Sequence, residues 1–231
     1  MKTPFSKVTH RKPPPTPSEL LAAVRWGEVD RVKQFLEQGA DSNTVDELSG
    51  KPLLILAAGL NMSGIHRQLI LSDLLRHGAD PRKTDRHGNT ALHEAIRCRD
   101  RTSAQLLLDH GVDIDARNIY GATCLHVAAR AAMASGNVQT VSFLLDRGAN
   151  SLIRDKRSMT PLQMTVNEML HHVQSGNVIA LLKRHEEGKS PECALRENAI
   201  ALDDVHRAAA DKTHANLKQN VQKRRRGTFR L

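Results

Sequence analysis

The feature that most constrains this chain is a nine-residue pattern that recurs along its middle. The pattern is clearest at residues 88–96, GNTALHEAI, and it returns 33 residues later at residues 121–129, GATCLHVAA. A third copy occupies residues 158–166, and a degenerate copy occupies residues 50–58. Between the copies runs a second pattern, which ends in Gly-Ala-Asp or a close variant and occupies residues 35–41, 74–80, 107–113 and 144–150. This strict alternation predicts stacked modules that share one continuous core.

The two alternating patterns resemble those of the ankyrin-repeat family, whose unit reads G-x-T-P-L-H-x-A-A and later L-L-x-x-G-A-D. The resemblance extends roughly from residue 18 to residue 185. It implies an all-α solenoid of about five units, each made of a hairpin, a helix, a turn and a second helix. The ankyrin-repeat domain is expected over residues 17–189, with units at about 17–46, 47–85, 86–118, 119–155 and 156–189.

The repeat also decides between two interpretations of the histidine at position 93. A His-Glu pair on a helix can begin a zinc site, but the second histidine would have to stand where this chain has Arg97. The resemblance implies instead that His93 hydrogen-bonds to Thr90, which caps the helix, and braces the next unit. Residues expected in such repeat-motif roles are Thr90, His93, Thr123, His126 and Thr160, with Gly39, Gly78, Gly111 and Gly148 ending the second helices.

The units differ in length. Successive helix-ending glycines are 39, 33 and 37 residues apart, and the extra residues fall within residues 59–71 and 130–138. Four or five additional residues are about one helical turn, so either the first helix or the loop between helices is longer in these units. In the first unit, Ser18 is expected to cap the first helix and Gly27 to form the turn between helices.

The basic charge is concentrated at the two ends of the chain. The net charge is +9, yet residues 17–182 carry 18 basic and 18 acidic side chains. Residues 1–16 carry four basic side chains and no acidic one, and residues 183–231 carry twelve and seven. A neutral body with basic ends limits contact with a polyanion, such as nucleic acid, to the tails.

The tails suggest further interpretations. Residues 1–16 are expected to form a disordered, proline-rich segment, and residues 11–17 fit either a linker or an SH3 ligand. Residues 190–221 have apolar positions at helical spacing and predict an amphipathic C-terminal helix on the last unit. Within the basic tail, residues 222–231, the possibilities are a nuclear import signal, a nucleic-acid contact and a solvated end, carried by Lys223, Arg224, Arg225 and Arg226.

The sequence contains few features that would indicate a catalytic or secreted protein. Cys98, Cys124 and Cys193 have no paired spacing, which favours a reducing compartment. No apolar run reaches the roughly 20 residues of a membrane span, and no signal peptide is recognised. We therefore expect a cytoplasmic protein, or a nuclear one in a eukaryote or a host, without a metal, a cofactor, a catalytic set or a membrane partner.

The resemblance implies protein recognition through the hairpin tips and the concave face of the first helices. Tyr120, the only tyrosine, stands between basic tips, so we expect a partner protein with an acidic rim and an apolar pocket. Two alternatives are a nucleic-acid- or chromatin-associated regulator and a bacterial effector that mimics host ankyrin adaptors. The expected partner-binding residues are Arg86, His87, Asn89, Ile119, Tyr120, Ala122, Lys156, Arg157 and Met159.

Overall fold

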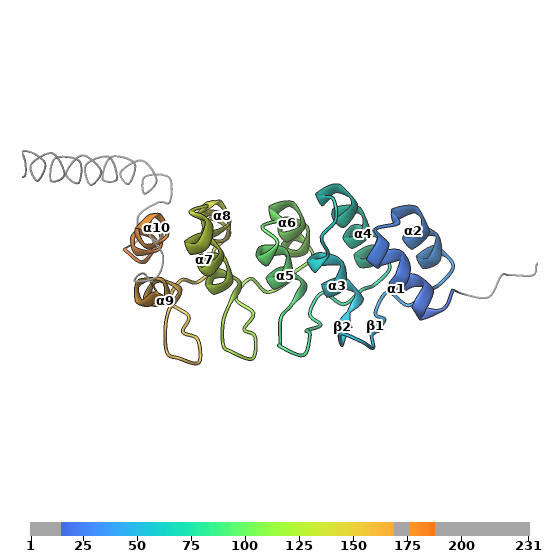
Figure 1. Ribbon diagram of the computed structural model, residues 1–231, viewed down its shortest axis with the longest axis horizontal. Helices are drawn as coiled ribbons and strands as arrows, with labels where there is room; N and C mark the ends of the chain where they lie inside the picture. Colours follow the sequence, from blue (N-terminus) through green and yellow to red (C-terminus); the bar gives the residue numbers. More distant parts are fainter. Residues whose placement is uncertain (1–14, 169–175, 188–231) are drawn as a thin grey trace, which may run out of the picture.

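The computed structural model describes residues 15–168 and 176–187. Within these ranges the chain forms ten α-helices, which pack as five consecutive pairs, and one short hairpin (Figure 1). The first helices are α1 (Pro17–Trp26), α3 (Leu53–Gly59), α5 (Ala91–Arg97), α7 (Cys124–Ser135) and α9 (Pro161–Glu168). The second helices are α2 (Val29–Glu37), α4 (Gly64–Arg76), α6 (Arg101–Asp109), α8 (Gln139–Asp146) and α10 (Gly176–Glu186). The expected all-α solenoid is confirmed.

The five helix pairs stand in a row, so the molecule is elongated (Figure 1). Each first helix packs against the first helix of the next pair, from α1 through α3, α5 and α7 to α9. The segments that connect one pair to the next project toward the same edge, beside the first helices (Figure 1). One of them contains the hairpin of β1 (Val45–Asp46) and β2 (Lys51–Pro52), in which Val45 lies opposite Pro52. We call the projecting ends of these segments the tips. The tips and the first helices together form one continuous face.

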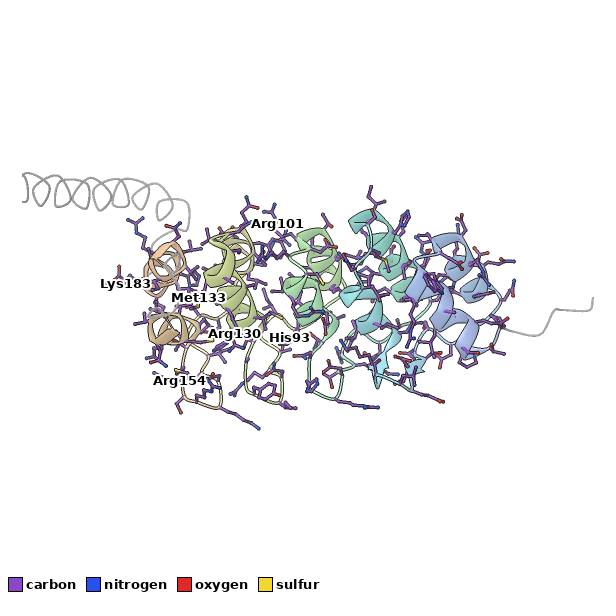
Figure 2. All side chains as sticks on the ribbon, viewed as in Figure 1. His93, Arg101, Arg130, Met133, Arg154 and Lys183 are labelled. Atoms are coloured by element: carbon purple, nitrogen blue, oxygen red, sulfur yellow. The ribbon has the colours of Figure 1, made fainter. Side chains whose placement is uncertain are left out.

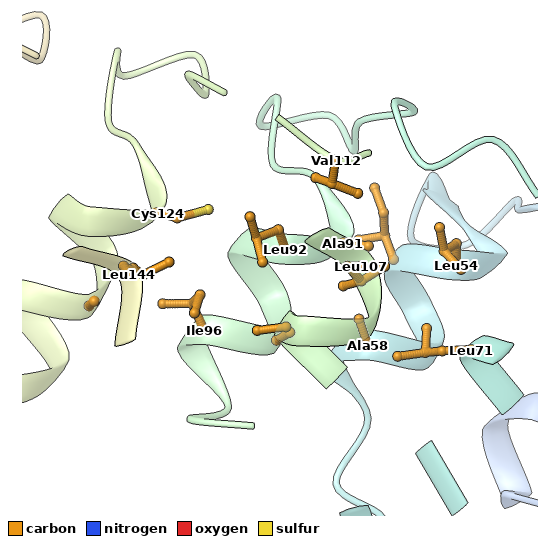
Figure 3. Close-up of a cluster of buried hydrophobic side chains, with 14 of the residues drawn as sticks. Leu54, Ala58, Leu71, Ala91, Leu92, Ile96, Leu107, Val112, Cys124 and Leu144 are labelled. Carbon is orange, nitrogen blue, oxygen red and sulfur yellow. The ribbon is translucent and has the colours of Figure 1, made fainter. Parts of the chain in front are cut away.

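The core is a single row of aliphatic side chains that runs through the helix pairs (Figure 3). Leu92 and Ile96 of α5 and Leu107 of α6 are completely buried. Fully burying a leucine or isoleucine stabilises a fold by about 1.5–3 kcal/mol. Ala58 and Ala91 are also fully buried, and their small side chains let α3 and α5 approach closely. The low aromatic content of 3% is therefore sufficient, because packing uses branched chains and alanine.

The unequal unit lengths have two different structural causes. In the fourth unit the first helix is longer, because α7 has 12 residues where α5 has 7. In the second unit α3 keeps 7 residues, whereas α4 extends to 13 after a linker at residues 60–63. The longer first helix that the spacing allowed is thus found in the fourth unit, whereas in the second unit most of the extra residues lengthen the second helix, which neither interpretation anticipated.

The start of α1 differs from the expectation. The helix begins with Pro17, a residue well suited to the first helical turn, and its N-cap is Thr16. The Thr16 Oγ1 atom accepts the backbone N–H of Glu19 at 3.4 Å, and the Glu19 carboxylate accepts the N–H of Thr16 at 2.8 Å. The expectation that Ser18 caps α1 is therefore wrong, because Ser18 already lies inside the helix. Gly27 does form the turn after α1, at φ 68°.

Some predictions fall outside the described residues. They concern most of the segment at residues 1–16, the helix at residues 190–221 and the basic tail at residues 222–231 with Lys223, Arg224, Arg225 and Arg226. The unit boundaries stated from the sequence also stay a prediction.

Candidate functional site

Hydrogen bonds between neighbouring units fix the positions of the tips. The backbone N–H of Ile119 donates to the carbonyl oxygen of His87, and that of Lys156 donates to the carbonyl oxygen of Tyr120, both at 2.9 Å. Gly121 lies so close to the next tip that a Cβ atom there would be 2.9 Å from the Lys156 nitrogen. Successive tips therefore form a tight, continuous edge that holds Tyr120 beside Lys156.

Each of the last three tips is also held by one polar side chain at its base. The Asn118 Oδ1 atom accepts the backbone N–H groups of Tyr120 and Ala122, each at 3.0 Å. Asp85 and Asp155 accept the corresponding pairs of N–H groups in the neighbouring tips. Our sequence analysis missed these three residues. The sequence pattern that marks them is an Asp or Asn three residues before the first glycine of the repeat motif, or before the residue that replaces it. Side chains of this type accept backbone N–H groups in turns.

The histidines of the repeat motif connect the first helices to the following tips. His93 Nδ1 accepts the N–H of Thr90 at 3.3 Å and lies 3.0 Å from Thr90 Oγ1, while His93 Nε2 faces the Ala122 carbonyl oxygen at 3.3 Å. His126 repeats this arrangement with Thr123, and its Nε2 atom faces the Met159 carbonyl oxygen at 3.1 Å. Burial lowers the pKa of both imidazoles. These side chains brace the tips.

Between the last two tips and the first helices lies a groove of about 610 Å³, which we call the cationic groove. Its apolar floor includes residues of α7 and α9, and Figure 2 shows Arg130 on the side of α7 that faces the tips. The residues that line it are Arg97, Asn118, Tyr120, Ala122, His126, Val127, Arg130, Ala131, Ala134, Asp155, Lys156, Arg157 and Met164. The fourth and fifth units thus combine apolar area with a polar rim, as binding sites on proteins commonly do.

Positive charge dominates the rim of the cationic groove. Four of its lining side chains are cationic and one, Asp155, is acidic. Asp155 already accepts backbone N–H groups of its own tip. The Arg130 guanidinium lies 3.6 Å from the Met164 sulfur atom, so it covers part of the floor. The groove is therefore suited to a ligand that has both an apolar surface and carboxylates.

A buried carboxylate fixes the inner wall of this groove. Glu94 accepts hydrogen bonds from Lys51 of the second unit at 2.8 Å and from Arg97 Nε at 2.7 Å. Burial raises the pKa of Glu94, but the hydrogen bonds from Lys51 and Arg97 outweigh burial and leave this pKa below its ordinary value. The Glu94 carboxylate therefore stays charged and holds Arg97 at the edge of the cationic groove.

The expected partner-binding residues divide into two groups. Tyr120 is 59% exposed and Ile119 45% exposed. Arg86, His87, Lys156 and Arg157 are also exposed. Of the expected residues, Tyr120, Ala122, Lys156 and Arg157 line the cationic groove. The expected exposure is wrong for Asn89, Ala122 and Met159, which are half-buried.

The physical reason is that these three residues make contacts that hold neighbouring units together. The Asn89 carboxamide accepts a hydrogen bond from Asn118 at 3.0 Å, and the Ala122 and Met159 carbonyl oxygens face the bracing histidines. Met159 also packs against the core.

A second groove lies at the other end of the same face, over α1, α3 and the β1–β2 hairpin. It has a volume of about 720 Å³ and includes Trp26 and Leu48, which are 81% and 82% exposed. Arg25 forms an ion pair with Asp46 at 2.8 Å, so the charges of these two side chains cancel. This N-terminal groove is therefore largely apolar. Leu48 comes from the second unit, whose copy of the repeat motif is degenerate.

Residues 15–168 and 176–187 contain no group of three or more His, Cys, Asp and Glu side chains placed to hold a metal ion. In the same ranges, no helix is both long and apolar enough to cross a membrane.

Comparison with known proteins agrees with this architecture. A family model described as ankyrin repeats (3 copies) matches residues 20–118 and residues 68–155, which together form more than half of the chain. Relatives include potassium channel KOR2 of Oryza sativa subsp. japonica, 36% identical over 88 residues, and the 2-5A-dependent ribonuclease of Mus musculus, 40% identical over 73 residues. The mitochondrial disaggregase of Bos taurus is 28% identical over 177 residues.

The shared stretches cover 38%, 32% and 76% of this chain but only 11%, 9% and 24% of these three relatives. The likeness thus concerns the repeat region, whereas the named activities belong to the much longer relatives. From the alternating motifs, the stacked helix pairs and the family model together, the chain belongs to the ankyrin-repeat family.

Proposed function

We propose that this protein binds a partner protein in the cationic groove and acts without catalysis, as an adaptor, scaffold or regulator. The observation that carries the proposal is the juxtaposition of an apolar floor, four cationic side chains and the exposed ring of Tyr120 in one groove. Aromatic rings and arginines are the side chains most often responsible for binding energy at protein interfaces. The tight hydrogen bonding of the tips supports the proposal, because little ordering would be needed on binding.

The proposed partner presents an apolar side chain surrounded by carboxylates. The apolar group would cover Val127 and Ala131 on the floor, while carboxylates would approach Arg130, Lys156 and Arg157. Such complementarity accelerates association, and the effect weakens as salt screens the charges. The varied names of the relatives support a recognition role, since a channel, a ribonuclease and a disaggregase each match part of this chain. We place the interaction in the cytoplasm, where the free thiols of Cys98 and Cys124 would stay reduced.

The test begins with cross-linking and mass spectrometry on the full chain, to identify the partner and the residues it contacts. In a calorimetric titration with that partner, Tyr120→Ala is expected to weaken binding by about 2 kcal/mol, or roughly 30-fold in Kd. Trp26→Ala is the matched control, because it removes another exposed aromatic ring from the opposite end of the face. Unchanged affinity for Tyr120→Ala, or a loss confined to Trp26→Ala, would show that the cationic groove is not the binding site.

A further inference from the structure

Two large apolar side chains lie exposed at the N-terminal groove. Trp26 is 81% exposed and Leu48 is 82% exposed. Trp26 is the last residue of α1, and Leu48 lies in the turn between β1 and β2, yet both line the same groove. Contact between water and so much apolar surface is unfavourable, and clustered apolar side chains on the surface of a folded protein commonly mark an interface.

Backbone hydrogen bonds hold Trp26 at this exposed position. Gly27 follows it in the left-handed conformation, at φ 68°. The N–H of Gly27 donates to the Val24 carbonyl oxygen at 3.1 Å, and that of Glu28 donates to the Ala23 carbonyl oxygen at 3.0 Å. This pair of hydrogen bonds closes the end of a helix. The backbone at Trp26 is therefore already ordered, so an interface made by its ring needs little further ordering of the main chain.

The floor of the N-terminal groove is suited to an aromatic ring. It includes Leu21 of α1, Leu56 of α3 and Leu60 at the end of α3, which are half-buried and pack against the core. The volume of about 720 Å³ lies in the range of pockets that hold ligands larger than an indole ring. One surface thus carries both an exposed ring and a recess for such a ring. A two-fold contact between identical chains requires this self-complementarity, because both copies use the same surface.

The charges around the N-terminal groove permit two copies to meet. Arg25 and Asp46 are the charged residues of its lining, and they form an ion pair with each other. Glu47 is exposed beside Leu48, and Arg86 lies so close to Gly50 of the same hairpin that a Cβ atom there would collide with its guanidinium. Positive and negative side chains are therefore balanced. No excess of one charge would repel a second copy, and like charges brought together are the main electrostatic obstacle to such a contact.

We propose that the N-terminal groove is the interface of a weak two-fold dimer, in which Trp26 of each copy enters the groove of the other. One aromatic side chain buries roughly 150–250 Å², and each ring would cover a comparable area of the opposite groove, which gives about 600–1,000 Å² in total. The two Leu48 side chains bring this area toward the roughly 1,200 Å² at the lower limit of stable interfaces. The dimer is therefore expected to dissociate in the micromolar range.

The dimer would present two cationic grooves, because that groove lies at the other end of the row of helix pairs (Figure 1). Only this consequence rests on the proposed function. The contact itself rests on the apolar surface and the balanced charge of the N-terminal groove.

Trp26 is the sole tryptophan of the chain, so its fluorescence reports directly on this interface. In the full chain diluted to about 1 μM, where a weak interface dissociates, acrylamide should quench the exposed ring freely. At about 300 μM the emission should shift to shorter wavelength, and quenching should fall to about half or less, because most chains are then dimeric. Sedimentation equilibrium over the same range should show an average mass that rises toward twice that of the monomer and no further.

Leu48→Asp keeps the tryptophan as the reporter and places a carboxylate in both halves of the interface. It should abolish the spectral shift and the rise in mass, because each half would bury an unpaired charge. Leu152→Asp is the matched control, since it changes another exposed leucine in the segment between α8 and α9, outside the N-terminal groove. This control should dimerise like the native chain, and circular dichroism should show equal Tm for all three chains. Undiminished association of Leu48→Asp would overturn the proposal.

Four other results would also contradict the proposal. A ring that is protected from acrylamide at every concentration would mean that another part of the same chain occupies the groove. Growth beyond two copies would indicate an open, head-to-tail contact. Association that weakens steeply with salt would indicate a charged interface. A monomer with an exposed ring at about 300 μM would show that no second copy binds there.

These measurements need no partner protein, so the dimer and the proposed function fail separately. A monomeric chain would remove the dimer and leave partner binding in the cationic groove intact. Conversely, Tyr120→Ala without effect on partner affinity would remove the proposed function, even if the chain proved to be dimeric.

Discussion

Ser158 adopts a backbone conformation that residues other than glycine seldom take. Its φ is 60°, and it occupies the turn position that glycine holds in the preceding tips, at φ 71° for Gly88 and 73° for Gly121. The turn itself is unchanged, since the Ser158 N–H donates to the Asp155 carbonyl oxygen at 3.0 Å. A left-handed conformation costs an L-residue roughly 1–2 kcal/mol. The fifth unit thus retains the turn at an energetic cost that glycine would avoid.

Ser158→Gly is therefore expected to raise the free energy of unfolding by up to about 1 kcal/mol, because the relief of strain exceeds glycine's entropic cost. Urea denaturation followed by circular dichroism measures the change. Gly88→Ala is the opposite control: its Cβ would lie 2.9 Å from the Ile119 nitrogen, and φ is again positive, so it should destabilise the chain. A destabilised Ser158→Gly chain would mean that the serine makes a contact that outweighs its strain.

At the scale of the element, helix starts depend on reciprocal hydrogen bonds between a cap and the third helical residue. The α1 helix uses Thr16 and Glu19, and α9 uses Thr160 with Gln163, whose Oε1 atom accepts the Thr160 N–H at 3.1 Å. Thr160 follows from the repeat, but Thr16 lies in a stretch that we expected to be disordered. Proline at the first helical position was the signal for the earlier start.

Thr16→Ala is expected to lower the free energy of unfolding by about 1 kcal/mol, because the Glu19 N–H loses the Thr16 Oγ1 atom, one of its two acceptors. Ser18→Ala should change it by less than about 0.5 kcal/mol, as for most surface positions. Thermal unfolding of both variants measures the difference. A larger loss for Ser18→Ala than for Thr16→Ala would return the capping role to Ser18.

The length of α7 also has a functional consequence at this scale. Its extra turn, compared with α5, includes Ala131 and Ala134, which line the cationic groove. The spacing of the glycines revealed the additional residues but could not place them in a helix or a loop. Only the structure shows that they extend the apolar floor beneath Lys156 and Arg157.

At the scale of the whole molecule, two buried histidines make the solenoid sensitive to mild acid. The Thr90 N–H can only donate, so His93 Nδ1 must be an unprotonated acceptor there, and the same holds for His126 with Thr123. Burial lowers both pKa values below the ordinary value of about 6.5. As the pH falls below about 6.5, the unfolded chain takes up these protons first, so the folded state loses stability.

We expect the free energy of unfolding to be retained above pH ~6.5 and to fall as the pH is lowered from there, because both folded-state pKa values lie below that of the unfolded chain. His126→Gln should flatten this dependence, because Gln163 already supplies the cap without a titrating group. Urea unfolding at a series of pH values measures both. An identical slope in the variant would show that His126 is not responsible. Asp100, whose pKa lies at about 2 because hydrogen bonds from Thr102, Ser103 and Arg67 outweigh burial, contributes only at lower pH.

Much of the candidate site could be predicted from the sequence because it lies on the repeat. Tyr120, Lys156 and Arg157 follow from their place beside the tip position, which the periodic motif locates. Arg97 and Arg130 were not singled out, since nothing in a periodic pattern shows that two helices direct cations into one groove. The exposure of Asn89, Ala122 and Met159 was wrong because their hydrogen bonds are made to the neighbouring unit, at a separation that local sequence does not reveal.

The sequence by itself determined the family, the order of the helices and the positions of the tips. Each of these depends on interactions within one unit, and the residues that make them recur in several copies of the repeat. Tertiary structure alone decided where a groove opens on the shared face and which charges surround it. The physical reason is that the groove is formed by side chains of adjacent units, and its shape depends on how α5, α7 and α9 pack. No single unit contains that information.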